Sequence, residues 1–430
     1  MHPKDLLDHC TALTALLLHF EHPAETVAGR YFREQRALGP RERATVAETV
    51  YAILRRKPLF EWLARSGSGA TERRLAILGF AGARPVLQAT LSLEEQQWLA
   101  ACDQARADAL PEALTHNLPP WLAEALQVQL GPRFDAAAAA LLQAAPLDLR
   151  VNTLHTKRNA VLATLQQEGL AATATPYSPW GIRLVDKPNI SRLELFRNGH
   201  IEVQDEGSQL LALLLDARRG EMVADFCAGA GGKTLALGAA MRNTGRLYAL
   251  DTSAHRLEQL KPRLARSGLE NVYPMAIADE RDERLQRLAG KIDRVLVDAP
   301  CSGLGTLRRQ PDLKWRQTPD QVRAFAERQK TILHHAARLL KPGGRLVYAT
   351  CSLLPAENEA VALDFSAAHA TLFKPLNTAQ LLREFKVPDA EQLCTPAANS
   401  FGVPAGQFLR LWPDLHGTDG FFGAVWQKTG

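Results

Sequence analysis

The sequence IDRVLVDAPCSGLGTLRRQPDLKW occupies residues 292–315 of a 430-residue chain. Its first residues are rich in valine and leucine, which is typical of a strand buried on both faces of a parallel sheet. The strand ends at Asp298, and Pro300, Cys301 and two glycines follow. Ligands of open α/β sheets bind outside the carboxyl ends of the strands, so we expect this acid and this thiol to form the floor of an active site.

A basic and aromatic flank follows the glycines. Arg308, Arg309, Lys314 and Trp315 combine positive charge with an indole ring, which suits contacts to phosphates and bases. We expect the arginine pair to be exposed, and Lys314 and Trp315 to face a substrate rather than the core. These residues are therefore our first candidates for contact with a nucleic acid.

Composition indicates a soluble globular protein of two or three domains, because 46% of the residues are hydrophobic and 23% are charged. A net charge of +5 permits a polyanionic partner without requiring one. Six cysteines are scattered without Cys-x-x-Cys spacing, which predicts a reducing cytoplasmic location and no metal site. No apolar run reaches the roughly 18 residues of a membrane helix. We expect neither a membrane segment nor a signal peptide, and a monomer.

The hydrophobic pattern divides the chain into three domains. Residues 1–145 show helical spacing, and their Arg55, Arg56 and Arg73 form either a solvated face or a face for RNA phosphates. Residues 146–205 predict a small α/β module, with strands at 147–152, 171–177 and 181–186 and a helix at 158–168. Residues 206–430 alternate between strand and helix. Their expected strands are 221–226, 245–251, 271–279, 292–298 and 345–352, and a hairpin of 408–412 and 421–426 closes the sheet.

A glycine-rich turn follows the first strand of the third domain, at Cys227-Ala-Gly-Ala-Gly-Gly-Lys233. Such a turn lets backbone amides approach a ligand, and the helix that begins there favours a negative group. A full phosphate-binding P-loop would need glycine in place of Cys227, so that reading is excluded. Asp251 ends the next strand, where an acid can bind ribose hydroxyls. These two features alone would also fit a dinucleotide dehydrogenase, but thiols at later strand ends argue against one.

Several segments together resemble a known family, the RNA cytosine-5 methyltransferases. They are 225–234, 298–315, the Thr350-Cys351-Ser352 strand end and 419–422, with 149–152 and 203–208 as lead-in segments. The resemblance implies an α/β class I S-adenosylmethionine-dependent methyltransferase, with a Rossmann-like seven-stranded sheet. A small α/β module and an N-terminal all-α NusB-like domain would precede it. The helical part is short for that domain, so we expect it to be trimmed.

The resemblance implies transfer of a methyl group from S-adenosylmethionine to C5 of a cytosine in RNA, with 16S ribosomal RNA as the expected target. Spacing alone leaves open which cysteine attacks. In the family the Thr-Cys residue adds to C6 and the Pro-Cys residue assists release, so Cys351 is the expected nucleophile and Cys301 the helper. Asp298 would bind the base, and Lys233 would supply positive charge. The target base must be unpaired or flipped to reach a buried thiol.

The resemblance also assigns the binding residues. The expected cofactor residues follow four strand ends: Cys227, Ala228, Gly229, Ala230, Gly231, Gly232, Lys233, Asp251, Asp279 and Asp298. The expected RNA contacts are Arg150, Asn152, Arg308, Arg309, Lys314 and Trp315. The chain departs from the family at Gly229-Ala230, where a small residue followed by proline is usual, and at Glu280, where a small residue is expected.

Two other functions stay open at this stage. A ribosome-assembly factor could keep this fold and bind RNA without catalysis, although intact cysteines at both strand ends argue against it. A methyltransferase acting on transfer RNA, on DNA or on protein is a nearer alternative.

Overall fold

The computed structural model describes residues 1–107 and 110–429, and the chain divides into two compact units. The first unit comprises Met1–Ala144 together with Thr306–Thr318. The second comprises Ala145–Gly305 and Pro319–Gly430. Residues 306–318, which the sequence pattern places in the third domain, therefore group with the N-terminal helices.

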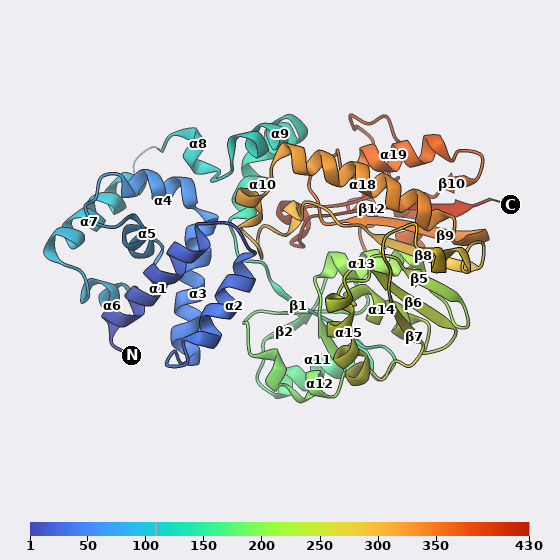
Figure 1. The fold of residues 1–430 in the computed structure, drawn as a ribbon, viewed down its shortest axis with the longest axis horizontal. Helices are drawn as coiled ribbons and strands as arrows, with labels where there is room; N and C mark the ends of the chain where they lie inside the picture. Colours follow the sequence, from blue (N-terminus) through green and yellow to red (C-terminus); the bar gives the residue numbers. More distant parts are fainter. Residues whose placement is uncertain (108–109, 430) are drawn as a thin grey trace. The chain divides into compact units, whose positions relative to one another are not determined.

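The first unit is helical, as predicted (Figure 1). Its helices are α1 (Pro3–Leu17), α2 (Ala24–Glu34), α3 (Pro40–Arg55), α4 (Lys57–Ala64), α5 (Thr71–Gly79), α6 (Arg84–Gln88), α7 (Leu93–Ala107), α8 (Glu112–Thr115), α9 (Pro120–Leu130), α10 (Phe134–Leu141) and α17 (Leu313–Arg316). Helix α3 begins at Pro40 directly after Gly39, where proline needs no hydrogen-bond acceptor. Leu7 and Leu13 of α1, Ile53 of α3 and Leu75 of α5 are fully buried in one core.

The segment 306–318 is held within this helical unit by polar contacts. The Lys314 ammonium donates to the carbonyls of Arg55 at 2.8 Å and Asn117 at 2.7 Å. The Trp315 indole N–H donates to the carbonyl of Leu54 at 2.7 Å, and the ring packs against the core of the unit. These contacts satisfy backbone groups at the end of α3, so the segment is an integral part of the helical fold.

The second unit begins with a small α/β module. Its elements are β1 (Leu147–Val151), α11 (Arg158–Gln167), β2 (Ala172–Ala174), β3 (Gly181–Leu184), α12 (Glu194–Arg197) and β4 (Ile201–Val203). The antiparallel sheet has the order β2-β3-β1-β4. The predicted strands and helix are present with shorter bounds. We did not predict α12 or β4, because elements this short carry little periodicity.

A larger sheet with its helices follows. Its elements are α13 (Glu206–Leu215), β5 (Met222–Asp225), α14 (Gly232–Ala240), β6 (Arg246–Asp251), α15 (Ala254–Ser267), β7 (Val272–Ala276), α16 (Glu283–Gln286), β8 (Ile292–Asp298), α18 (Pro319–Ala337), β9 (Leu340–Thr350), α19 (Glu359–Ala368), β10 (Phe373–Pro375), α20 (Thr378–Glu384), β11 (Leu409–Leu411), α21 (Pro413–His416) and β12 (Phe421–Lys428).

The strand order is that of a class I methyltransferase. It runs β10-β12-β9-β8-β5-β6-β7, with β11 paired to β12 off this path. Strands β5 to β9 are parallel, and β12 is antiparallel to β9. The predicted Rossmann-like sheet with an antiparallel end is confirmed. Two bounds were wrong: β7 ends at Ala276, so Asp279 lies beyond the strand, and β9 already begins at Leu340.

Helices cover both faces of this sheet (Figure 1). Helices α13, α14 and α15 pack on one face, and α18 and α19 pack on the other. Side chains of β8 alternate accordingly, because Leu296 joins the first core while Val295 and Val297 join the second. Burial on both faces leaves the carboxyl ends of β5, β6, β8 and β9 at one edge as the place for polar chemistry.

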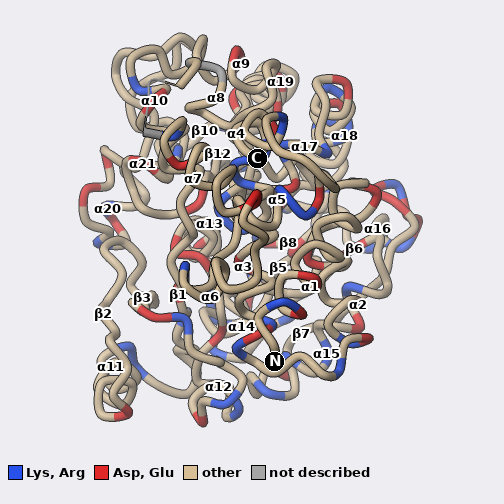
Figure 2. Tube along the Cα trace, turned by 90° about the vertical axis from the view of Figure 1, so that its left-hand side faces the viewer, with Lys and Arg blue, Asp and Glu red and all other residues tan. Residues whose placement is uncertain are grey.

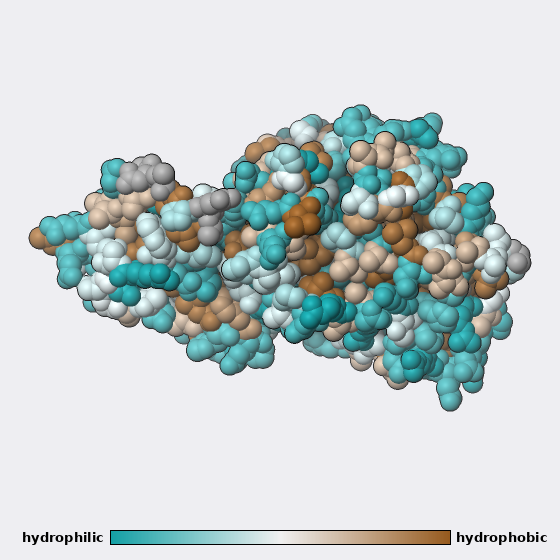
Figure 3. All heavy atoms as spheres, turned by 90° about the horizontal axis from the view of Figure 1, so that it is seen from above, coloured by the Kyte–Doolittle hydropathy of each residue, from teal (hydrophilic) through white to brown (hydrophobic). Residues whose placement is uncertain are grey.

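The surface is mixed in character. On the side shown in Figure 2, basic and acidic residues are interspersed along the trace. On the face shown in Figure 3, apolar residues occur in small groups among hydrophilic ones. Within residues 1–107 and 110–429, no helix has the length and apolar character needed to cross a bilayer.

Candidate active site

Two thiols meet at the carboxyl ends of neighbouring strands. Strands β8 and β9 pair in parallel, with Asp298 opposite Ala349, and the chain reaches Cys301 and Cys351 just beyond them. The two sulfur atoms lie 3.4 Å apart, and both cysteines are free. Parallel neighbours end at the same edge, so the sheet itself brings the thiols together.

The two thiols differ in their electrostatic environment. The hydrogen bond with Cys351 raises the pKa of Cys301 well above its ordinary value, and burial and the charge of Glu357 raise it further. Cys301 therefore keeps its proton at neutral pH. Either sulfur can be the donor in the contact between them, and Cys301, when protonated, can donate its S–H to a Cys351 thiolate.

An ion pair lies at the same sheet edge. The Lys233 ammonium donates to Asp298 Oδ2 at 2.7 Å. Burial opposes the charge on Lys233, but the negative charges of Asp298, Cys351 and Asp225 outweigh it and raise the pKa of this amine. Asp298 is only half-buried, so part of its carboxylate can still reach a ligand.

The glycine-rich turn after β5 has the shape of a cofactor loop. Gly229 and Gly231 adopt positive φ angles of +56° and +83°. A Cβ at Gly231 would lie 2.2 Å from the side chain of Leu260, whereas a Cβ at Gly229 would meet nothing within 4 Å. The loop is therefore tightly packed at Gly231, where α14 starts, and open at Gly229.

Asp251 joins this loop to the end of β6. Its Oδ2 accepts from the Gly229 N–H at 2.8 Å, and its Oδ1 accepts from the Ser253 N–H at 2.7 Å. The two strand ends that the sequence assigns to a cofactor are thus linked directly. A glycine loop with open space at Gly229, the start of a helix and a buried acid fit a nucleoside with an adjoining charged group.

Asp225 and Cys227 are buried parts of the same loop. Burial raises the pKa of Asp225 to about 7, partly offset by the Thr234 hydroxyl, which donates to Oδ2 at 2.7 Å. The Asp225 Oδ1 atom is buried and has no hydrogen-bond partner among the residues that the structure describes. Burial also raises the pKa of Cys227 well above its ordinary value, which suits a packing thiol rather than a nucleophile.

The structure places several expected site residues elsewhere. Asp279 is exposed, and its Oδ1 accepts from the Arg281 N–H at 2.7 Å. Arg150 is buried and donates to Gln204 Oε1 at 2.6 Å. Asn152 is buried and donates to the carbonyls of Gly199 and Ser267. Both side chains are engaged within the protein, and a contact of either with RNA stays a prediction.

The expected exposure of the basic flank was also wrong. Arg308 and Lys314 are only 6% and 3% exposed, and Arg309 and Trp315 are half-buried. The cause is the packing of residues 306–318 within the helical unit. A local charge pattern cannot reveal such tertiary burial.

Sequence reasoning missed Glu357, which hydrogen-bonds to Ser302 and Ser352, the residues that follow the two cysteines. One acid in a turn gives no periodic signal, so nothing in the sequence alone singled it out.

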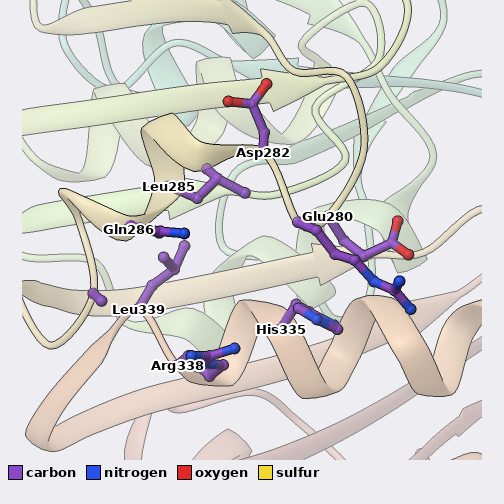
Figure 4. A pocket seen from close by; sticks show the side chains of 9 residues that line it. Glu280, Asp282, Leu285, Gln286, His335, Arg338 and Leu339 are labelled. Atoms are coloured by element: carbon purple, nitrogen blue, oxygen red, sulfur yellow. The ribbon is translucent and has the colours of Figure 1, made fainter.

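A separate pocket of about 530 Å³ lies between the turn before α16 and the end of α18 (Figure 4). It is lined by Glu280, Arg281, Asp282, Leu285, Gln286, Ala289, His335, Arg338 and Leu339. None of the predicted catalytic residues lines it. The candidate site is therefore defined by the thiols, the ion pair and the loop.

The sequence of this chain is similar to those of known proteins. The family model described as 16S rRNA methyltransferase RsmB/F matches residues 212–427, and the ferredoxin-like domain model of RsmF/B-like methyltransferases matches residues 118–191. The "Ribosomal RNA small subunit methyltransferase B" of Sodalis glossinidius is 32% identical over 364 residues, covering 78% of this chain and 83% of the relative. The protein of the same name from Xanthomonas campestris is 29% identical and covers 90% of each chain.

Solved structures show the same fold. A methyltransferase homologue from Pyrococcus horikoshii has a TM-score of 0.62 at 30% identity, covering 74% of this chain and 97% of that one. NSun6 from the same organism has a TM-score of 0.61 at 22% identity, covering 73% and 98%. The N-terminal helices fit a NusB-like module. With its catalytic half matched by the family model, this chain belongs to the RsmB/F family of 16S rRNA methyltransferases.

Proposed function

We propose that this chain transfers a methyl group from S-adenosylmethionine to C5 of a cytosine in 16S ribosomal RNA, through a covalent bond between Cys351 and C6. The observation that carries the proposal is the pair of thiols 3.4 Å apart at adjacent strand ends, next to the Lys233–Asp298 ion pair. The names of the curated relatives support a ribosomal RNA of the small subunit as the target.

The cofactor would be held by the loop after β5 and by the end of β6. The open space at Gly229 would leave room for the cofactor, and the start of α14 and the carboxylate of Asp251 would offer donors and an acceptor for its amino-acid and ribose groups. S-adenosylmethionine supplies a methyl group on a positively charged sulfur, which is a strong electrophile.

The chemistry requires activation of a weak carbon nucleophile. The Cys351 thiolate would add to C6, forming the S–C6 bond and moving an electron pair of the ring onto C5. A free cysteine is only a few per cent ionised at neutral pH, so the Lys233 ammonium would stabilise the thiolate. The half-buried Asp298 would hydrogen-bond to the base and ease the addition.

Release reverses the addition after C5 has received the methyl group. A base removes the C5 proton, the electron pair of that C–H bond restores the C5–C6 double bond, and the S–C6 bond breaks with its electrons on the sulfur of Cys351. The sulfur of Cys301 lies 3.4 Å from that sulfur, and its S–H can donate a hydrogen bond to the departing thiolate as the bond breaks. The two thiols thus have different tasks, addition and release.

Single substitutions of the two thiols test this division. Cys351→Ala should form no adduct and should leave methylation at background. Cys301→Ala should still add and methylate, but release should stall and leave the protein attached to RNA. With S-adenosylmethionine and an unmodified 16S ribosomal RNA transcript, a denaturing gel should show a retarded protein–RNA band for Cys301→Ala only.

A control variant and two contrary outcomes complete the test of the two thiols. Cys10→Ala changes a buried cysteine of the helical unit and is the matched control, which should behave as the wild type. A band in Cys351→Ala alone would exchange the roles of the two thiols. Methylation persisting in both variants without a band would exclude covalent catalysis.

A further inference from the structure

Glu357 is a fully buried carboxylate in the turn between β9 and α19. Its Oε1 accepts from the Ser302 N–H at 2.8 Å and from the Gln329 amide at 3.1 Å. Its Oε2 accepts from the hydroxyls of Ser302 and Ser352, each at 2.5 Å. Across residues 1–107 and 110–429 no Lys or Arg forms an ion pair with Glu357, so these hydrogen bonds are what stabilises its charge.

The donors come from the two turns that carry the thiols. Ser302 follows Cys301 directly, and Ser352 follows Cys351 directly. One carboxylate therefore bridges the turn after β8 and the turn after β9. The two serine hydroxyls also lie 3.3 Å from each other, so both turns converge on Glu357.

Two neighbouring side chains, Gln329 and Asn358, hydrogen-bond to residues that flank the thiols. The Gln329 amide also donates to the carbonyl of Pro300 at 2.9 Å, just before Cys301. Asn358 accepts from the Thr350 hydroxyl at 2.5 Å and donates to the carbonyl of Ser352 at 2.9 Å. Asn358 thus contacts residues of the Cys351 turn alone, whereas Glu357 contacts residues of both thiol turns.

We propose that Glu357 is a positioning residue that keeps the S–H of Cys301 beside the sulfur of Cys351 while the methylated base is released. The proposal rests on the covalent function proposed above, because only that chemistry needs the second thiol. Hydrogen-bond donation to a leaving sulfur depends on contact distance, and a displacement of about 1 Å can slow such a step by about 100-fold. A carboxylate that fixes both turns prevents that displacement.

The charge of Glu357 has a second effect on the same thiol. It contributes to the raised pKa of Cys301, after the hydrogen bond with Cys351 and burial. The carboxylate therefore adds to the other causes that disfavour loss of the proton from Cys301. An amide in its place would keep the shape but lose the charge, and its NH2 group could not accept from the donors that one of the two carboxylate oxygens receives.

The test is Glu357→Gln in the full chain, assayed with S-adenosylmethionine and an unmodified 16S ribosomal RNA transcript. Adduct formation should continue, because Asn358 still holds the Cys351 turn. Release should slow by between about 10- and 100-fold, so the protein–RNA band should accumulate, and turnover and KM should fall together while kcat/KM changes little. A wild-type rate of release in Glu357→Gln would overturn the proposal.

A double-substitution cycle separates positioning from a general loss of structure. In a Cys301→Ala background, Glu357→Gln should change the rate of release by less than about twofold, since the group that it positions is already absent. If Glu357→Gln slows release equally in the wild type and in Cys301→Ala, the role of Glu357 is merely structural. If no protein–RNA band forms, even for Cys301→Ala, the covalent function itself is contradicted. Failure of that function can thus be told apart from failure of the positioning proposal.

The controls address folding. Glu359→Gln removes a second buried carboxylate near the same helix start, one that pairs with Arg410 instead of the thiol turns. It should lower stability without accumulating the adduct. If Glu357→Gln does not fold, Ser352→Ala and Ser302→Ala each remove one hydroxyl of the bridge. Each should slow release by a smaller factor, and normal release in both would refute the proposal.

Discussion

Asp225 shows at the scale of a single residue how burial changes chemistry at this site. Its carboxyl group is buried, has one hydroxyl donor, and has a pKa raised from the ordinary 3.8 to about 7. Between these two values the folded protein holds a proton that the unfolded chain has lost. The stabilisation from this proton is complete below about pH 4 and is lost as the pH rises through 7.

Asp225→Asn should remove this pH dependence. A shift of this size corresponds to roughly 4 kcal/mol of unfolding free energy lost between about pH 4 and pH 7. The measurement is chemical denaturation of both proteins across that range, because other carboxyl groups cancel in the difference. The wild type should lose stability relative to Asp225→Asn as the pH rises, and parallel curves would contradict the assigned environment.

The sequence predicted some of these residues and not others, for a physical reason. Cys301 and Cys351 could be predicted as neighbours because each follows a buried strand of a parallel sheet. The roles of Arg150, Glu357 and Lys314 could not, because their partners come from turns or from distant segments. The sequence does not distinguish a buried polar side chain from an exposed one, because burial depends on a partner that lies elsewhere in the chain.

At the scale of elements, the end of β6 and the loop before α14 act as one piece. Asp251 connects them through the N–H of Gly229, so a change at the strand end also alters the loop. Strand ends of this kind were predicted well, since their valine- and leucine-rich runs are long. The three-residue strands β4 and β10 were missed, and β7 was drawn too long, because a short element leaves too few residues to define a period.

Asp251→Ala should weaken binding of S-adenosylmethionine by about 1–3 kcal/mol, the usual cost of an unpaired buried polar group. Both the expected contact to ribose and the anchor of Gly229 would be lost. Isothermal titration calorimetry measures the effect, with Asp279→Ala as the comparison, since that acid is exposed beyond the end of β7. Unchanged affinity in Asp251→Ala would contradict the assignment of this strand end to the cofactor.

At the scale of the whole molecule, the division into units does not follow the order of the chain. The sequence pattern predicted a helical, a small α/β and a large α/β region, because each has its own periodicity. It could not show that residues 306–318 leave the large α/β region and complete the helical unit. That assignment depends on hydrogen bonds between Lys314 or Trp315 and the carbonyls of Leu54, Arg55 and Asn117.

Lys314→Met should leave the salt dependence of RNA binding unchanged. The ammonium is 3% exposed and donates to two backbone carbonyls, so it is not free to displace counterions from phosphates. The measurement is the slope of log affinity against log salt for a 16S ribosomal RNA transcript. Arg309→Gln is the contrasting variant: if Arg309 contacts a phosphate, as the sequence predicts, the slope should fall by about one unit. A fall of that size in Lys314→Met would contradict the buried position.

The insertion of residues 306–318 has a consequence for the order of biosynthesis. Met1–Ala144 leaves the ribosome well before Thr306–Thr318 is translated, a delay on the order of ten to thirty seconds at usual rates of synthesis. During that time the carbonyls at the end of α3 lack Lys314 and Trp315 as donors. The nascent helical unit can therefore complete its fold only after the strand and turn that carry Cys301 have been made.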